Sequence, residues 1–598
     1  MWLKFLLGLV LSLAFYVFNN IQKQAFLKDE QKKFTFPKSS ALIPPNVEVP
    51  QPPSGSILHV YEKAAVCSDK NICSNIGSVI LQHKGNAIDS AIATLLCNGL
   101  VTMQSMGLGG GVIMTYYRRQ EKKAISIIGR ERAPLNINLE KLKSQYNAST
   151  FAKSVYSIAV PGEVAAYYEA HHQYGSLPWS YLLQPTLELC YQGYQLTRHQ
   201  RDALFLNEEM IRKDKLLAAM FVDPKTNLFY REGYHISIPQ EVCATYKLLQ
   251  EEGPLTFYNG TLSSLIVKDL SEMGSWIKLE DLKSFKAVIK DSIALDLEPY
   301  YVHLPPAPAS GHVVGFIMQI LQKFKGKLSS VKEFGSLEVH RIVEALKFGF
   351  VKRWHYDSEM DQEVLENLFH SDSIKNITLL IDDLKTFEDP EHYGSTVKLT
   401  PTPDHGTAQI SVLAPNGDAV SATSSINYYF GSGRMGPRSG ILFNNAISDF
   451  TIENFENYFN LPNIEGINQL KAQKQPMSSM VPLIVTHKET GDVRLVVGAA
   501  GGSRIISTLV QILIRVLWQQ QNIKQAIDEP RFHHQLVPNI LEYEYGVFQQ
   551  VIGDLEARGH QTERIRRKCT AVCGVEKVEE GVVLANADYR KEGGVDGF

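Results

Sequence analysis

One stretch decides the fold: His405-Gly406-Thr407-Ala408-Gln409-Ile410-Ser411-Val412-Leu413-Ala414, which continues through Pro415-Asn416-Gly417-Asp418 into Ala419-Val420-Ser421-Ala422-Thr423. Apolar residues alternate with small or polar ones on both sides of Asn416-Gly417, a dipeptide typical of tight hairpin turns. The pattern predicts a β-hairpin with Thr407 at the mouth of its first strand. Pro401 and Pro403 exclude helix just before it, so we expect the Gly406-Thr407 peptide in an irregular segment that leads into a buried sheet.

A hydroxyl residue after a glycine is common at the start of a strand, and taken alone it is far more often a turn residue than a nucleophile. The surrounding motifs change that interpretation. Downstream of Gly-Thr-Ala-x-x-Ser-Val they occupy residues 421–427, 430–433, 439–445, 475–480, 497–502 and 588–594. Upstream they occupy residues 85–89, 105–111, 129–134 and 160–163. In this order they resemble the γ-glutamyltransferases (glutathione hydrolases) over nearly everything after Ile57.

The resemblance implies an α+β fold of the N-terminal nucleophile (Ntn) hydrolase type, a four-layer αββα sandwich. It also implies a single precursor that cuts itself between Gly406 and Thr407. Residues 57–406 would form the large subunit and residues 407–598 the small, catalytic subunit of a heterodimer.

A threonine hydroxyl is a weak nucleophile at neutral pH and needs a base. Cleavage before Thr407 would free its own α-amine, whose ordinary pKa near 8 suits that task, so no histidine, metal or other cofactor is required. By resemblance, Ser425 and Asn427 lie near the nucleophile and the substrate amine. The amides of Gly501 and Gly502 would hold the oxyanion, and phosphate is the rival ligand for this glycine turn, but no Gly-Lys-Ser/Thr completes a P-loop.

The resemblance also assigns the substrate contacts. Arg130 would fork onto the α-carboxylate of the glutamyl group, a task suited to a planar bidentate donor. Ser478 and Ser479 would hydrogen-bond the same carboxylate, and Asp449 would pair with the substrate ammonium. The implied reaction is ping-pong: a γ-glutamyl ester forms on Thr407 from glutathione or a related γ-glutamyl compound, and the group then passes to water, an amino acid or a dipeptide.

Two positions depart from the family pattern Asn-Asn-Glu-x-Asp-Asp-Phe. Ala446 removes a carboxylate that helps to hold the substrate ammonium, and Ser448 removes its near neighbour. We therefore expect reduced affinity for glutamyl groups, while Thr407 and its surroundings are retained. The alternative is a weak or inactive relative that serves as a secreted binding or effector protein.

The charge balance gives no case for nucleic acid. The 598 residues include 60 lysines and arginines and 63 aspartates and glutamates, for a net charge of −3. A small-molecule substrate is the expected partner.

The N-terminus predicts delivery across a membrane. Residues 5–18 form an apolar run behind Lys4, and bulky or polar residues follow where a signal peptidase prefers small ones. Residues 1–18 are thus expected to be an uncleaved signal anchor, with a cleaved signal peptide as the alternative. Residues 19–56, polar and then proline-rich, form a stalk. The catalytic body would lie on the extracellular side of the plasma membrane as a single-pass type II protein, or be secreted.

Seven cysteines are too few for a disulfide scaffold. Cys73 and Cys97 match positions that pair in the family, Cys67 is expected to be the odd thiol, and Cys569 and Cys573 would pair only off a regular helix. Sequons at Asn147, Asn259 and Asn376 fit an extracellular body. His171-His172 and His533-His534 are adjacent pairs whose side chains diverge on a helix, so no metal is expected.

Periodicity predicts further elements. Apolar residues at 87–96 indicate a helix that ends before Gly99, and the glycines at 107–111 come before a strand at 112–117. That order excludes a dinucleotide-binding loop, in which the glycines follow a strand. We also expect a helix at 339–354 with an acidic loop after it, a strand at 494–497, a turn at 498–502 and a helix at 505–520.

Overall fold

The computed structural model describes residues 44–360, 364, 367–369, 371–395, 406–453, 466–565, 570–579 and 581–598. The chain divides into two units, Met1–Val47 and Glu48–Phe598, and the fold and the site belong to the second. The expected anchor at 1–18 and most of the stalk lie outside the described residues. Within the part of the chain from Pro44 onward that the structure describes, no helix combines the length and apolar character needed to cross a bilayer.

Two seven-stranded sheets form the centre of the fold, and every strand pair in both sheets is antiparallel. The first sheet has the order β19 (Gly594–Gly597), β2 (Ala65–Ser68), β10 (Gly406–Leu413), β11 (Ala419–Asn427), β3 (Gly111–Arg118), β4 (Lys123–Gly129), β7 (Val288–Asp291). The second has the order β1 (His59–Tyr61), β18 (Val582–Ala587), β17 (Ala571–Glu579), β13 (Val493–Ala500), β12 (Leu483–His487), β9 (Tyr300–Leu304), β8 (Ile293–Leu297). Buried side chains such as Leu413 and Cys67 from the first sheet pack against Val496 and Cys573 from the second.

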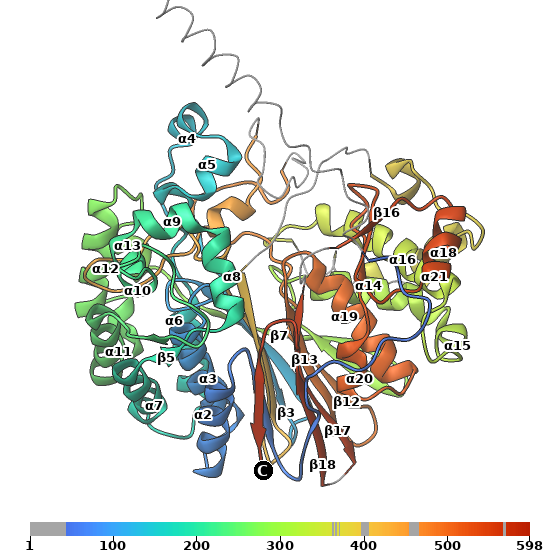
Figure 1. Ribbon diagram of the computed structural model, residues 1–598, viewed down its shortest axis with the longest axis horizontal. Coiled ribbons are helices and arrows are strands. Elements are labelled where there is room, and N and C mark those ends of the chain that lie inside the picture. Colours follow the sequence, from blue (N-terminus) through green and yellow to red (C-terminus); the bar gives the residue numbers. More distant parts are fainter. Residues whose placement is uncertain are drawn as a thin grey trace, which may run out of the picture. The chain divides into compact units, whose positions relative to one another are not determined.

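Helices cover the outer faces of the sandwich. Figure 1 shows one group to the left of the strands: α2 (Asn71–Gln82), α3 (Ala87–Val101), α6 (Glu163–Tyr174), α7 (Trp179–Gln192), α11 (Gln240–Glu252) and α12 (Thr261–Glu272). A second group lies to the right: α14 (Gly311–Gln322), α16 (Ser336–Trp354), α19 (Arg504–Leu513), α20 (Ile523–Asp528) and α21 (Gln549–Ala557). Each group closes its own apolar core against one sheet. The predicted α+β, four-layer arrangement is confirmed.

Smaller elements complete the unit. The short helices are α4 (Leu139–Gln145), α5 (Ala148–Ala152), α8 (Arg198–Leu206), α9 (Glu208–Lys213), α10 (Lys215–Phe221), α13 (Leu279–Lys283), α15 (Lys325–Leu328) and α18 (Ser371–Leu380). The strands outside the two large sheets are β5 (Tyr194–Gln195), β6 (His235–Ile236), β14 (Phe532–His533), β15 (Leu541–Tyr543) and β16 (Thr562–Arg564).

The predicted hairpin is the pair β10–β11, and its turn uses Gly417 at a φ of 84°, a conformation that favours glycine. Every residue of both strands is buried, because the second sheet covers one face and helices such as α3 cover the other. Gly406 was expected before the strand but is its first residue. The irregularity is confined to a register shift between Gly406 and Thr407.

Three boundary predictions were wrong. Helix α3 continues through Gly99 to Val101, since the missing side chain at Gly99 admits the backbone of Gly107, whose Cα lies 3.1 Å from where a Cβ would stand. Gly498 belongs to strand β13, where a Cβ would meet the side chain of Gln409 on the facing sheet. The expected acidic loop after α16 contains helix α18.

Two disulfides join neighbouring helices in the part of the chain that the structure describes. Cys73 pairs with Cys97, which links α2 to α3 across a separation of 24 residues, a closure that contributes about 3 kcal/mol in the chain-entropy estimate. Cys190 pairs with Cys243 and links α7 to α11, a pairing that the sequence did not indicate. Cys67 and Cys573 are buried free thiols, and Cys569 lies outside the described residues. The sequon residues Asn147, Asn259 and Asn376 are exposed.

Glu163 is a buried carboxyl at the start of α6, just behind the hairpin. It accepts hydrogen bonds from Ser424 Oγ at 2.7 and 2.9 Å and from the Tyr167 hydroxyl. Burial raises the pKa of Glu163 to about 8, against these hydrogen bonds, which lower it. The folded protein therefore keeps this proton over a pH range in which an unfolded glutamate, with a pKa near 4.3, has lost it.

This proton gives a testable pH dependence. Between about pH 4.5 and pH 8 the folded state binds one more proton at Glu163 than the unfolded state, so its contribution to stability falls as the pH rises. We expect Glu163→Gln to remove a decline on the order of a few kcal/mol from the wild-type profile, measured by denaturant unfolding at several pH values. Glu169→Gln, on the same helix, is the control and should keep the wild-type slope. An unchanged slope in Glu163→Gln would contradict the assignment.

Candidate active site

One pocket beside the start of β10 gathers the predicted site residues. It contains about 80 Å³ of free volume. Its lining residues are Arg130, Arg353, Thr407, Ser425, Asn427, Asp449, Met477, Ser478, Ser479, Met480, Gly502, Ser503, Ile505 and Gln535. All predicted catalytic and substrate-binding residues are in this set except Gly501, which directly precedes Gly502 in the turn after β13.

The Gly406–Thr407 peptide lies within reach of two hydroxyls. Ser425 Oγ donates a hydrogen bond to the carbonyl oxygen of Gly406 at 2.6 Å, and Thr407 Oγ1 lies 3.4 Å from the same Ser425 oxygen. Lys591 donates to the next carbonyl, that of Thr407, and is held there by Asp69. The Gly406 carbonyl is therefore polarised by a hydroxyl while a second hydroxyl stands on the adjacent residue.

Gly406 has no room for a side chain. A Cβ there would lie 2.7 Å from the carbonyl oxygen of Gln104 and 2.8 Å from that of Tyr428. Both contacts are with backbone atoms, which cannot move aside cheaply. Glycine at this position thus allows the peptide to begin the buried strand β10 beside Ser425.

Arg130 follows β4 and uses its donors within the protein. Its Nε donates to the carbonyl of Pro476 at 3.2 Å, Nη1 to Glu131 at 2.6 Å, and Nη2 to Asp449. Burial alone would lower the pKa of Arg130, but the two carboxylates raise it, so the guanidinium stays charged. The residue predicted for the substrate carboxylate and the residue predicted for the substrate ammonium are therefore paired with each other.

The two departures from the family pattern lie in a short 3₁₀ helix, Ala446–Asp449. The Ala446 side chain is fully buried in an apolar cluster with Ile447 and Phe450, and Ala446 does not line the pocket. The position at which the family pattern has a glutamate therefore carries a methyl group without charge. Among the described lining residues, Asp449 is the carboxylate that the pocket offers.

Asn444 and Asn427 fix the segment that carries Asp449. Asn444 is fully buried; its Oδ1 accepts from the amides of Ala159 and Ala446 at 3.0 and 2.9 Å, and its Nδ2 donates to the carbonyls of Gly109 and Ala159. Asn427 closes β11 with a φ of 76° and donates to the carbonyl of Asn445. These bonds connect the loop before Asp449 to the end of the hairpin.

Ser478 and Ser479 also line the pocket. The amide of Ser478 donates to the carbonyl of Pro308 at 2.8 Å, and Ser310 Oγ donates to the carbonyl of Ser478 at 2.6 Å. Ser479 Oγ accepts from Nη2 of Arg353 at 2.9 Å. Arg353 was missed from the sequence, because Lys352-Arg353 at the end of a helix reads as an ordinary basic terminus.

The glycine turn after β13 leads directly into α19. Gly501 and Gly502 have φ angles of 131° and 61°, and Ser503 is the N-cap of the helix. Both φ values lie in the region that favours glycine, so the turn brings backbone amides to the pocket without side chains in the way. This arrangement suits a developing oxyanion.

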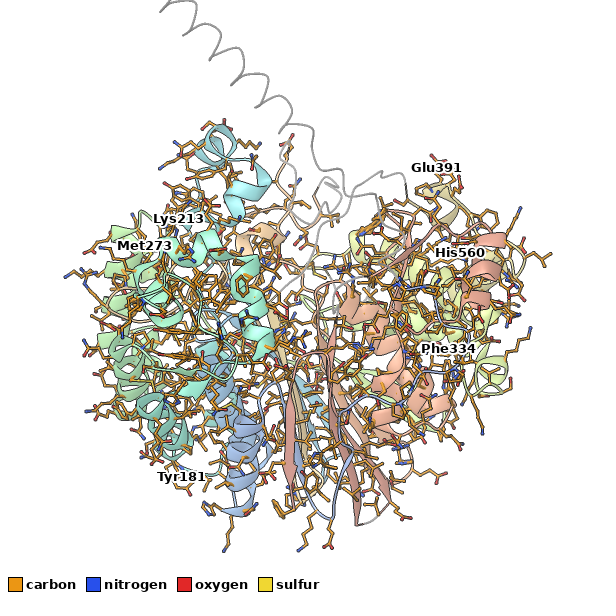
Figure 2. The ribbon with its side chains drawn as sticks, in the orientation of Figure 1. Tyr181, Lys213, Met273, Phe334, Glu391 and His560 are labelled. Atoms are coloured by element: carbon orange, nitrogen blue, oxygen red, sulfur yellow. A yellow bond between two sulfur atoms is a disulfide. The ribbon has the colours of Figure 1, made fainter. Side chains whose placement is uncertain are left out.

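A histidine cluster away from this pocket was also missed. His340, Glu344 and His560 bring one ligand-type atom each within 4.8 Å of one another, and Figure 2 places His560 among the helices on the right. His340 Nδ1 lies 2.8 Å from His560 Nε2. The ammonium of Lys347 lies 3.2 Å from the Glu344 carboxylate. This ammonium occupies the place beside Glu344 where a metal cation would bind. His560 lies 220 residues from His340 in the sequence, so no short-range motif indicates that their side chains meet.

Comparison with known proteins decides the family. Residues 73–598 match the family described as Gamma-glutamyltranspeptidase. The chain belongs to this family. It is 36% identical over 550 residues to Scoloptoxin SSD14 of Scolopendra dehaani, covering 91% of this chain and 94% of that protein. It is 33% identical over 552 residues to Glutathione hydrolase 5 proenzyme of Mus musculus, covering 90% and 93%.

A solved structure agrees on the fold of this family member. The cephalosporin acylase from Bacillus halodurans superposes with a TM-score of 0.77 at 22% identity, covering 93% of this chain and 99% of that one. At this identity the likeness concerns the fold. The predicted family and the predicted fold are thus both confirmed.

The framework role of Asn444 can be tested by stability. Asn444→Ala removes the side-chain partner of the amides of Ala159 and Ala446 and of the carbonyl of Ala159, and we expect a loss on the order of 3–5 kcal/mol in the free energy of unfolding. Chemical denaturation measures it. Asn75→Ala, at an exposed asparagine with one hydrogen bond to Asp596, should change stability by less than about 1 kcal/mol. Equal effects of the two changes would refute the framework role.

Proposed function

We propose that this chain is a γ-glutamyl hydrolase and transferase that cuts itself between Gly406 and Thr407 and then works from the Thr407 hydroxyl. The single observation that carries the proposal is the hydrogen bond from Ser425 Oγ to the Gly406 carbonyl, with the Thr407 hydroxyl beside it. Membership of the γ-glutamyltranspeptidase family supports the substrate class.

The cleavage step uses these two hydroxyls. Thr407 Oγ1 attacks the carbonyl carbon of Gly406, and the Ser425 hydroxyl stabilises the charge that develops on the carbonyl oxygen. The amide nitrogen of Thr407 leaves with a proton, which gives an ester between Gly406 and the Thr407 side chain. Water then hydrolyses this ester, and the products are a chain ending at Gly406 and a chain beginning with the free amine of Thr407. The two chains stay together as a heterodimer.

Turnover repeats the same chemistry on a bound donor. The Thr407 amine accepts the proton of its own hydroxyl, which attacks the γ-carbonyl of glutathione or a related compound. The amides of Gly501 and Gly502 stabilise the oxyanion, the donor amine leaves, and a γ-glutamyl ester remains on Thr407. Water, an amino acid or a dipeptide then takes the glutamyl group and restores the hydroxyl.

Substrate binding rearranges the resting pocket. Arg130, Ser478 and Ser479 hold the donor carboxylate, and Asp449 has to share its carboxylate between Arg130 and the donor ammonium. Because Ala446 supplies no second carboxylate, we expect turnover that is slow but measurable, with a raised KM. A lost charge-assisted hydrogen bond of about 1.5–3 kcal/mol corresponds to roughly a 10- to 150-fold loss of kcat/KM.

A second candidate function is a secreted effector with little or no turnover. Two observations favour it: the apolar Ala446 in place of a carboxylate, and the 36% identity to a protein named as a scoloptoxin. For either function we propose an extracellular body, delivered by the segment at 1–18 and carrying glycans at the exposed residues Asn147, Asn259 and Asn376.

Self-cleavage is tested on a denaturing gel. Wild-type protein should give two chains, one of them the 192 residues from Thr407 to Phe598. Thr407→Ala should give one chain, because the attacking hydroxyl is gone, and Thr407→Ser should still give two. Ser425→Ala should slow the cleavage at least tenfold by removing the donor to the Gly406 carbonyl. A wild-type protein that stays in one piece refutes the mechanism.

Activity is tested by release of p-nitroaniline from γ-L-glutamyl-p-nitroanilide. We expect turnover by the cleaved wild-type protein and none by Thr407→Ala. Arg130→Lys should lower kcat/KM roughly 10- to 100-fold, because an ammonium cannot form the forked contact. If the correctly cleaved wild-type protein releases no product, the hydrolase proposal fails and the effector function replaces it.

A further inference from the structure

Arg353 is a charged pocket residue to which the proposed mechanism gives no role. It lies in the last turn of α16, and its Nη2 donates to Ser479 Oγ at 2.9 Å. Its Nε atom is buried and lacks a hydrogen-bond partner among the described residues. Within the same part of the chain no carboxylate lies within 4.0 Å of the guanidinium. The nearby carboxylate that favours its charge is Asp449, which is in direct contact with Arg130 instead.

The two pocket arginines differ in how their charges are balanced. Arg130 touches two carboxylates, Glu131 and Asp449, whereas Arg353 touches a hydroxyl. Burial lowers the pKa of Arg353 to about 10, against the nearby charge of Asp449, which raises it, so the guanidinium is still charged at neutral pH. His312, close enough to feel this charge, is buried and its pKa is lowered to about 3, so it is neutral and brings no compensation. A half-buried cation of this kind is stabilised when a ligand supplies an anion.

The pocket is poorly equipped for an ammonium group. Asp449 is the carboxylate among the described lining residues, and Arg130 already occupies it. An ammonium entering the pocket would have to compete with Arg130 for Asp449 and would be repelled by Arg353. A carboxylate entering the pocket meets two guanidinium groups and the hydroxyls of Ser478 and Ser479.

We propose that Arg353 and Arg130 together hold the carboxylate of the acyl donor, and that the site accepts ω-carboxyacyl amides without an amino group, the glutaryl class, as readily as γ-glutamyl amides. This inference rests on the proposed function of Thr407. The covalent steps are the same: the Thr407 oxygen bonds to the glutaryl carbonyl, the donor amine leaves with a proton, and water releases glutarate.

The test compares two donors with one leaving group. Glutaryl-p-nitroanilide and γ-L-glutamyl-p-nitroanilide differ in the α-ammonium group. We expect kcat/KM for the glutaryl compound to be higher than, or within tenfold of, the γ-glutamyl value. A glutaryl value more than tenfold lower would overturn the inference, and it would leave the proposed function standing as long as the γ-glutamyl donor is consumed.

Variants of Arg353 test the residue itself. Arg353→Met should raise KM for both donors at least tenfold with a smaller change in kcat, because the carboxylate loses one of its two cations. Arg353→Lys should recover part of that loss by restoring a charge without the fork. Lys352→Met, the neighbouring change on the same turn of α16, is the matched control and should keep the wild-type KM. Thermal denaturation verifies that each variant is folded; a KM within twofold of wild type in folded Arg353→Met would overturn the role.

A binding measurement separates the two proposals if neither donor is consumed. Calorimetric titration of the cleaved wild-type protein with glutarate and with L-glutamate compares the same pair of groups without chemistry. Glutarate binding as tight as, or tighter than, glutamate supports the two-arginine site even where the hydrolase proposal has failed. Binding of glutamate more than tenfold tighter, or no binding of glutarate, overturns it.

Discussion

The structure depends on the tightly packed peptide bond between Gly406 and Thr407. Gly406–Thr407 enters the middle of the first sheet between backbone carbonyls of Gln104 and Tyr428, under the hydroxyl of Ser425. The second sheet and the helices of the first group bury β10 and β11 on both faces, so the peptide cannot relax away from that hydroxyl. The glycine, the register shift between Gly406 and Thr407 and the burial of both strand faces act together at this peptide, where the Gly406 carbonyl lies beside two hydroxyls.

The electrostatics of the pocket follow from what surrounds Arg130. Two acidic side chains satisfy this arginine within the protein. The loop that carries one of them is anchored by the Asn444 side chain, which bonds to the backbone of Gly109 and Ala159. In the resting site Arg130 is therefore in contact with two carboxylates, whereas Arg353 hydrogen-bonds only the hydroxyl of Ser479 among the described side chains. A donor therefore has to separate the Arg130–Asp449 ion pair before its ammonium group can reach Asp449. Its carboxylate, in contrast, can approach Arg353 without breaking an ion pair.

The hairpin and most of the pocket residues could be predicted from the sequence because each lies in a short motif of neighbouring residues. The alternation around Asn416-Gly417 predicts the hairpin, and the ordered glycine and serine motifs predict the family, the fold and the residues that the pocket collects. What escaped the sequence is non-local. Arg353 reaches the pocket from the end of a helix, and Cys190 meets Cys243 only because α7 and α11 are neighbours. Gly99 looks like a helix stop until the backbone of Gly107 is found against it.

The order of strands in the two sheets has a consequence for how the cleaved protein unfolds and refolds. In the first sheet β10, β11 and β19 come from the chain after Gly406, and β2, β3, β4 and β7 from the chain before it; the second sheet is interleaved in the same way. A cut at Gly406 would leave two polypeptides woven through both sheets, and neither could depart without dismantling the sandwich. Unfolding would then separate partners that have to find each other again by diffusion, and re-forming the sheets would be a concentration-dependent encounter. Such a molecule is assembled once, as a single chain, and its lifetime is set by the rate at which it first comes apart.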